Sequence, residues 1–118
     1  MKNFKIKVAG TLSIFLISAA AAQAHARLDH TVPAAGSTVS SSPSQVTLIF
    51  TENLEPKFSG GDVVSLSGTR MDHGSSVSGS TMRIDVPGLP PGGYVVHWHA
   101  LSVDTHKSQG SFSFHVAK

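Results

Sequence analysis

The sequence of 118 residues contains no cysteine, and only 14% of its residues are charged. The absence of cysteine excludes disulfide bonds and the thiolate zinc sites that are common in small domains. The chain is long enough for one domain, which must be stabilised by a single packed core and by any ion that it binds. Beyond residue 24, no apolar run approaches the roughly 20 residues that a membrane-spanning helix needs.

Residues 1–24 have the pattern of a secretory signal peptide. Three lysines fall within the first seven residues, a mostly apolar stretch follows over residues 8–22, and Ala22-Gln23-Ala24 supplies the small residues that signal peptidase recognises. The apolar stretch covers about 15 residues, which is short for a permanent membrane helix. We expect cleavage after Ala24, so that residues 25–118 form the exported mature domain and His25 is its first residue.

The net charge of +2 comes from the expected signal peptide rather than from the domain. Residues 1–24 hold three of the nine basic residues and none of the seven acidic ones, which leaves six basic and seven acidic residues in residues 25–118. Binding to nucleic acid or to an anionic membrane depends on clustered lysine and arginine, so neither is expected as a partner. All seven histidines remain in the domain.

Short apolar runs separated by glycine, proline and serine extend over residues 26–117 without a sustained helical period. This pattern is typical of an all-β domain, and about seven short strands favour a two-sheet sandwich. The expected strands cover residues 26–32, 45–51, 62–67, 75–79, 82–86, 93–101 and 110–117.

Alternation within these strands predicts which side chains form the core, because residues two apart point to the same face of a sheet. By this parity, His97, His99 and His115 point away from the core. The expected core residues are Val46, Leu48, Phe50, Tyr94, Val96, Trp98, Phe112, Phe114 and Val116.

A histidine at a newly cut N-terminus offers two nitrogen donors to one metal ion. The α-amine and the imidazole Nδ1 of His25 can close a six-membered chelate ring. In the precursor the same backbone nitrogen is an amide and a poor ligand, so cleavage would create the site. The alternative is that His25 follows the cleavage site by chance, because signal peptidase requires only the small residues before it.

Three more side chains are candidate ligands. Asp104 and His106 stand two residues apart in the polar connection between the last two expected strands, where both can face one ion. Glu52 directly follows a core strand and could reach the same ion or orient one of its histidine ligands. The alternatives are an ordinary solvated turn, in which aspartate is favoured, and an exposed carboxylate at a strand end.

Four separate stretches of the sequence together resemble a known protein family, and the set is far more specific than any single stretch. They are His25-Ala-Arg-Leu-Asp-His-Thr-Val-Pro-Ala-Ala-Gly-Ser, Ile49-Phe-Thr-Glu-Asn-Leu, Gly92-Gly-Tyr-Val-Val-His-Trp and Ser102-Val-Asp-Thr-His-Lys-Ser-Gln-Gly-Ser-Phe-Ser-Phe. In this order, and over essentially the whole mature chain, they resemble the CopC family of periplasmic copper-resistance proteins. The resemblance implies an immunoglobulin-like, barrel-like Greek-key sandwich that binds Cu(II) in the periplasm. It also implies that His25 and His106 are nitrogen ligands, Asp104 is an oxygen ligand and Glu52 is an axial or outer group.

The donor chemistry agrees with the metal that the resemblance implies. Amine and imidazole nitrogens with a carboxylate suit Cu(II) in tetragonal geometry, and the Irving–Williams order places Cu(II) above Zn(II) for such donors. Zinc is the ion that competes with copper in vitro. Because these donors bind only when deprotonated, we expect the affinity to fall below about pH 6 to 7, near the reference pKa of imidazole.

Some members of the family carry a Met-rich loop for Cu(I), for which thioether sulfur is a suitable soft ligand. In this chain the corresponding region retains only Met71 and His73 as candidates. Met82 shares its strand parity with Ile84 and is expected in the core. A Cu(I) site with two donors would be weak at best, and an ordinary exposed loop is the alternative.

The remaining histidines include candidates for an additional metal site. If the hairpin of the last two strands is centred near His106, His97 lies opposite His115, where Cβ atoms are about 5 Å apart. That pair, with His99 nearby, is a candidate for an additional metal site, and a plain surface histidine pair is the alternative. His30, close to the N-terminus, has no assigned role.

Three classes of function follow from these observations. The leading one is a non-enzymatic, monomeric copper carrier or buffer that passes Cu(II) to a membrane copper transporter or an outer-membrane copper protein. The enzymatic alternative is a copper oxidase with an N-terminal histidine chelate, although aromatic residues make up only 7% of the chain and Tyr94 and Trp98 are assigned to the core. The third is a metal-free, immunoglobulin-like interaction module.

Overall fold

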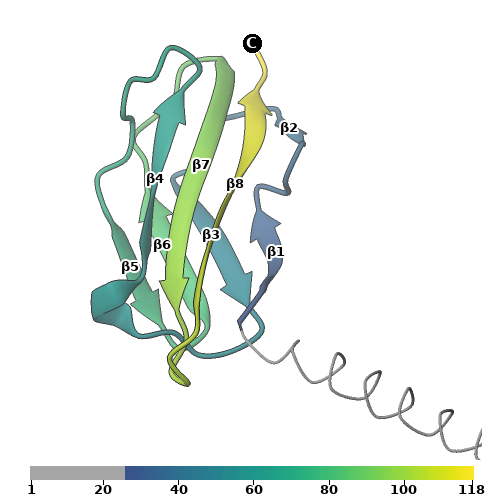
Figure 1. Ribbon diagram of the computed structural model, residues 1–118. Coiled ribbons are helices and arrows are strands. Elements are labelled where there is room, and N and C mark those ends of the chain that lie inside the picture. Colours follow the sequence, from purple (N-terminus) through teal and green to yellow (C-terminus); the bar gives the residue numbers. More distant parts are fainter. Residues whose placement is uncertain (1–25) are drawn as a thin grey trace, which may run out of the picture.

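The computed structural model describes residues 26–118 as two four-stranded sheets packed face to face (Figure 1). One sheet has the strand order β1-β3-β6-β5 and the other has the order β2-β8-β7-β4. The elements are β1 (Leu28–Val32), β2 (Thr38–Val39), β3 (Gln45–Phe50), the 3₁₀ helix η3 (Pro56–Phe58), β4 (Gly60–Ser65), β5 (Ser75–Ser78), β6 (Thr81–Asp85), β7 (Gly92–Leu101) and β8 (Lys107–Val116). Within residues 26–118, no helix combines the length and the apolarity needed to cross a membrane.

The sequence-based expectation of an all-β, immunoglobulin-like sandwich is confirmed. All seven expected strands are present, and an eighth, β2, adds two residues parallel to the end of β8. The largest difference in a strand start is at β8, which begins at Lys107 instead of residue 110. β4 begins at Gly60, two residues before the expected start. The sequence did not indicate this start, because Gly60 and Gly61 lack the β-branched or aromatic character expected of a strand.

The core forms where the strands alternate between apolar and polar residues. Seven of the nine expected core residues are buried, and Met82 is fully buried between the sheets as expected. Trp98 and Phe112 are only partly buried, and both pack against the edge of the core. The Trp98 ring meets Phe50 edge-on, with ring centroids 5.1 Å apart, so it joins the two sheets.

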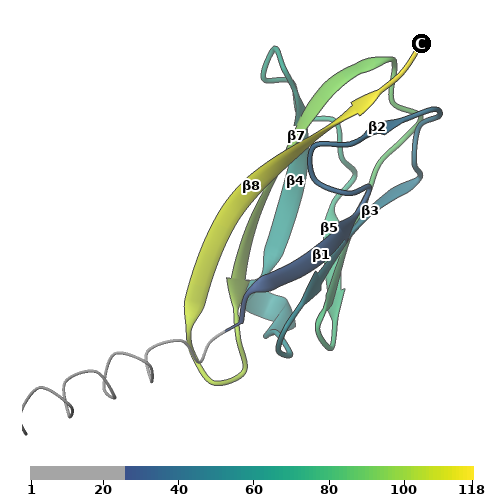
Figure 2. The ribbon, with the colours of Figure 1, turned by 90° about the vertical axis from the view of Figure 1, so that its right-hand side faces the viewer.

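Three segments far apart in the sequence meet at one end of the sandwich. The Thr51 amide donates to the Arg27 carbonyl over 2.9 Å, which ties the start of the described chain to the end of β3. The Val103 amide donates to the Asn53 carbonyl over 3.1 Å, which ties the β3–β4 connection to the β7–β8 loop. The start of β1 and the β7–β8 loop therefore lie at the same end of the molecule (Figures 1 and 2).

The expected pairing of His97 with His115 is wrong. In the β7–β8 hairpin His97 lies opposite Ser111, and His115 lies opposite Gly93. The cause is the position of the turn, which is centred at Asp104 and not at His106. The Ser102 amide donates to the His106 carbonyl over 2.9 Å, and Thr105 takes the left-handed conformation, with φ of 74°, that closes this tight loop.

Candidate metal centre

The β7–β8 loop brings Asp104 and His106 together at the end of the hairpin. Their facing atoms, Asp104 Oδ1 and His106 Nδ1, are 3.4 Å apart, and the two side chains are 44% and 58% exposed. Ser102 is fully buried beneath the loop, where its hydroxyl donates to Asp104 Oδ1 and its amide donates to the His106 carbonyl. The buried serine thus fixes the loop backbone while the two candidate donors stay accessible to solvent.

The surroundings of Asp104 keep its carboxylate ionised. The hydrogen bond from the Ser102 hydroxyl is the main reason that the pKa of Asp104 lies below its ordinary value. Partial desolvation acts in the opposite direction, and the neighbouring His106 adds a further lowering of this pKa. At neutral pH, Asp104 therefore presents an anionic oxygen donor.

Glu52 follows the end of β3, beside the first described residues of the chain. The Arg27 amide donates to Thr51 Oγ1 over 2.9 Å, in addition to the bond from the Thr51 amide to the Arg27 carbonyl. Ala26 is buried in the core at the same place. His25, the expected chelating ligand, lies outside the described residues, and Glu52 is the partly buried carboxylate that follows this anchored segment.

Residues 26–118 by themselves provide no complete metal centre. No group of three or more histidine, cysteine, aspartate or glutamate side chains in this part of the chain is placed to hold an ion. Within this part of the chain, Asp104 and His106 form a pair of candidate donors.

The candidates for a soft metal site lie apart from this loop, in the connection between β4 and β5. Met71 is partly buried and packs against the hydrophobic core, and its amide donates to the Val63 carbonyl over 2.8 Å. His73 is exposed, and its amide donates to the Asp85 carbonyl over 2.8 Å. The two residues follow one another closely in the chain, but one side chain faces the core and the other faces solvent.

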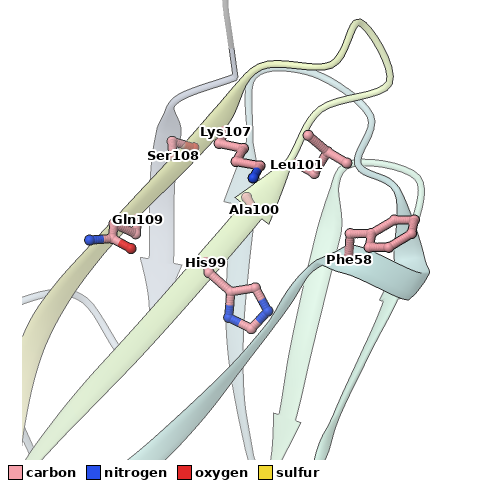
Figure 3. A pocket seen from close by; sticks show the side chains of 7 residues that line it. All are labelled: Phe58, His99, Ala100, Leu101, Lys107, Ser108 and Gln109. Carbon is pink, nitrogen blue, oxygen red and sulfur yellow. The ribbon is translucent and has the colours of Figure 1, made fainter.

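The outer face of the β4–β7–β8 sheet carries an arrangement that sequence reasoning missed. Asp62 on β4 is the cross-strand partner of His97 on β7, and Asp62 Oδ1 lies 3.2 Å from His97 Nδ1. In Figure 3 the imidazole of His99 extends from β7 toward β4, next to Phe58, Lys107 and Gln109 around a hollow of about 420 Å³. Alternation along β4 indicates that Asp62 faces outward, but only the pairing of β4 with β7 places it beside His97.

Comparison with known proteins decides the family. The CopC domain matches residues 28–117, which is nearly the whole of the described chain. The chain belongs to the CopC family. It is 38% identical over 112 residues to copper resistance protein C of Pseudomonas syringae pv. tomato, an alignment that covers 86% of this chain and 87% of the relative.

Solved structures of CopC-family proteins have the same fold as this chain. CopC from Methylosinus trichosporium OB3b superimposes with a TM-score of 0.75 at 30% identity, covering 79% of this chain and 94% of that one. PcoC from Escherichia coli, described as a methionine-rich copper resistance protein, gives a TM-score of 0.70 at 34% identity, with coverage of 79% and 99%. The resemblance of the four sequence stretches to CopC is thereby confirmed.

Proposed function

We propose that this CopC-family chain is a periplasmic protein that binds Cu(II) at the end of the sandwich formed by the β7–β8 loop. The α-amine and imidazole of His25 and the imidazole of His106 supply nitrogen, Asp104 supplies oxygen, and Glu52 is an axial or outer group. The observation that carries the proposal is the Asp104–His106 pair, held over buried Ser102 at the end where the described chain begins.

The donor set fits Cu(II) better than softer or harder ions. Nitrogen and carboxylate donors without thiolate favour Cu(II) over Cu(I), and the Irving–Williams order favours Cu(II) over Zn(II). The Asp104 carboxylate is ionised at neutral pH and needs no deprotonation when the ion arrives, and its lowered pKa keeps it ionised at more acidic pH than an ordinary aspartate. The imidazoles and the terminal amine still lose protons on binding, so acid opposes copper uptake.

The exposure of the loop suits a carrier or buffer more than an enzyme. Asp104 and His106 are about half exposed at a chain turn, so an acceptor can replace donors one at a time. Tyr94 is buried, and Trp98 packs edge-on against Phe50, so neither offers the aromatic surface on which a copper oxidase would bind its substrate. The acceptors that fit this role are a membrane copper transporter or an outer-membrane copper protein, served by a monomeric carrier.

Cu(I) binding at a second, methionine-based site is not favoured in this chain. PcoC is described as methionine-rich, whereas residues 26–118 here contain only Met71 and Met82. Met82 is fully buried and Met71 packs against the core, which leaves His73 as the exposed donor of that region.

The loop donors are tested by Cu(II) titration of the mature protein beginning at His25, with a competing chelator. His106→Gln and Asp104→Asn are each expected to weaken binding of the first equivalent by more than about tenfold, because each removes a donor to the metal. His30→Gln is the matched control, since His30 is exposed and also contacts an aspartate, with Nδ1 3.0 Å from Asp29 Oδ2. Equal affinity of the His106 variant and the unmodified protein would contradict the assignment.

A further inference from the structure

A shallow hollow on the outer face of the β4–β7–β8 sheet gathers side chains that the proposed copper centre does not use. Its volume is about 520 Å³, and it lies over the start of β4 and residues 97–99 of β7. It is a separate hollow from that of Figure 3, with which it shares His99 and Gln109. Its lining includes Asp62, Ser75, His97, His99 and Gln109. His97 and His99 point to the same face because they are two residues apart on one strand, with Cα atoms about 6.6 Å apart.

Both imidazoles lean toward β4. His97 Nδ1 lies 3.2 Å from Asp62 Oδ1, its cross-strand partner. His99 lies opposite Gly60, and a Cβ built on that glycine would stand 3.5 Å from His99 Cε1 and 3.8 Å from Nε2. A Cβ at Gly60 would therefore be in ordinary van der Waals contact with the His99 ring, which places this ring over the start of β4, and its one close contact would be with Ser75 Oγ at 2.9 Å.

The carboxylate of Asp62 prepares His97 as a metal ligand. An imidazole that donates its Nδ1 hydrogen to a carboxylate has its tautomer fixed, so that Nε2 carries the free lone pair. The same contact holds the orientation of the ring. Asp62 is 39% exposed and His97 is 56% exposed, so both side chains are accessible to solvent.

One cation also lines the hollow, but its charge is compensated. The guanidinium of Arg70 contacts the buried carboxylate of Asp72 through two bonds of 3.1 Å, from Nε to Oδ1 and from Nη2 to Oδ2. The repulsion that Arg70 exerts on an incoming divalent cation is therefore reduced, while Asp62 contributes an additional negative charge.

We propose that His97 and His99 form a second Cu(II) site, in which Asp62 is a positioning residue that acts through His97. Two imidazoles at positions i and i+2 of one strand can converge on one ion, with water filling the other coordination positions. Two protein ligands make this site weaker than a centre with four. No third histidine, cysteine, aspartate or glutamate in residues 26–118 is placed to complete a larger group of ligands. The site does not depend on His25 and differs from the pair His97–His115, which the register of the hairpin separates.

The test uses Cu(II) as the probe and the mature protein beginning at His25. Titration is expected to show a second equivalent of weaker affinity, with electron paramagnetic resonance parameters typical of nitrogen ligands. His97→Gln and His99→Gln should each weaken this second equivalent by more than about tenfold and leave the first unchanged. His115→Gln is the matched control, because His115 is exposed on the same sheet and lies opposite Gly93.

The positioning role of Asp62 requires a separate readout. Asp62→Asn should weaken the second equivalent by about 10- to 100-fold while the nitrogen hyperfine pattern of the remaining complex is retained. Asp62→Glu should restore part of the affinity, which a purely structural role would not predict.

Two results would overturn the inference. One is a titration that ends at a single equivalent, and the other is a second equivalent that persists in both the His97 and the His99 variants. Protein with one extra residue before His25 separates this inference from the proposed function. It should lose the first site and keep the second, so either site can fail without the other.

Discussion

At the scale of single residues, Asp72 shows how a buried charge is stabilised in this domain. Its side chain is fully buried, and it accepts hydrogen bonds from the Val63 amide, the Gly74 amide and the Arg70 guanidinium. Burial on its own raises the pKa of Asp72, but these hydrogen bonds and the charge of Arg70 outweigh it and hold the pKa below the ordinary value. The ionised form is therefore favoured by folding.

The sign of this shift predicts how the stability depends on pH. A carboxyl group whose pKa is lowered by folding contributes stability above its unfolded pKa of about 3.9, and this contribution disappears as the pH falls through the folded pKa. At pH 7, Asp72→Asn should lower the free energy of unfolding by about 1–3 kcal/mol, because buried donors lose a charged acceptor. Below about pH 3 the difference between variant and unmodified protein should shrink.

Urea unfolding at both pH values measures this effect. Asp85→Asn is the control, because Asp85 is exposed and accepts a single side-chain bond, from Gln45 Nε2 over 3.1 Å. A penalty for Asp72→Asn that stays constant between pH 7 and pH 3 would show that the stabilisation comes from packing and not from the charge.

At the scale of elements, the β7–β8 hairpin depends on close contact between a glycine and a tryptophan. Gly110 lies opposite Trp98, and a Cβ at residue 110 would stand 2.8 Å from Trp98 Cζ2 and 3.1 Å from Cε2. Such contacts are too short for carbon atoms, so the indole ring has to move if residue 110 gains a side chain. The movement would disturb the packing of Trp98 against Phe50.

Gly110→Ala is therefore expected to destabilise the domain by about 1–3 kcal/mol, the usual cost of overpacking. Because Trp98 is the only tryptophan of the chain, its fluorescence should change as well. Gly88→Ala is the matched control, since a Cβ at Gly88 meets nothing within 4 Å. Unchanged stability and unchanged Trp98 emission in the Gly110 variant would contradict the contact.

The same hairpin marks the limit of what the sequence could predict about the elements. Alternation correctly assigned the inward faces of β3, β7 and β8, because the period of two is a local property of a strand. The register was missed because it depends on where the turn closes, and neither the burial of Ser102 nor the positive φ of Thr105 can be read from a local pattern. β2 was missed because two residues are too short to show any period.

At the scale of the whole molecule, the candidate site residues also divide into those that a local pattern predicts and those that only the fold brings together. Asp104 and His106 were identified from their spacing in a single loop, and the structure places them 3.4 Å apart. Asp62 was missed because its relation to His97 arises from pairing between strands that are 35 residues apart in the chain. Contacts within one turn can be predicted from neighbouring residues, whereas contacts between strands require the topology.

The topology also explains why the two proposed copper positions can act separately. One lies at the tip of the β7–β8 loop, and the other lies on the outer face of the sheet, over the start of β4 and residues 97–99 of β7. They draw on different side chains: Asp104 and His106 in the loop, and His97, His99 and Asp62 on the sheet. Changes at one position should leave copper binding at the other intact.

The measurement that tests the central claim most directly is a chelator-competition titration of Cu(II) into two forms of the mature domain. One form begins at His25, and the other carries a single extra alanine before it, which turns the α-amine of His25 into an amide. The account predicts that the first form binds its tightest equivalent more strongly by at least about tenfold, because only that form offers the amine and imidazole together. Equal affinities in the two forms would contradict it.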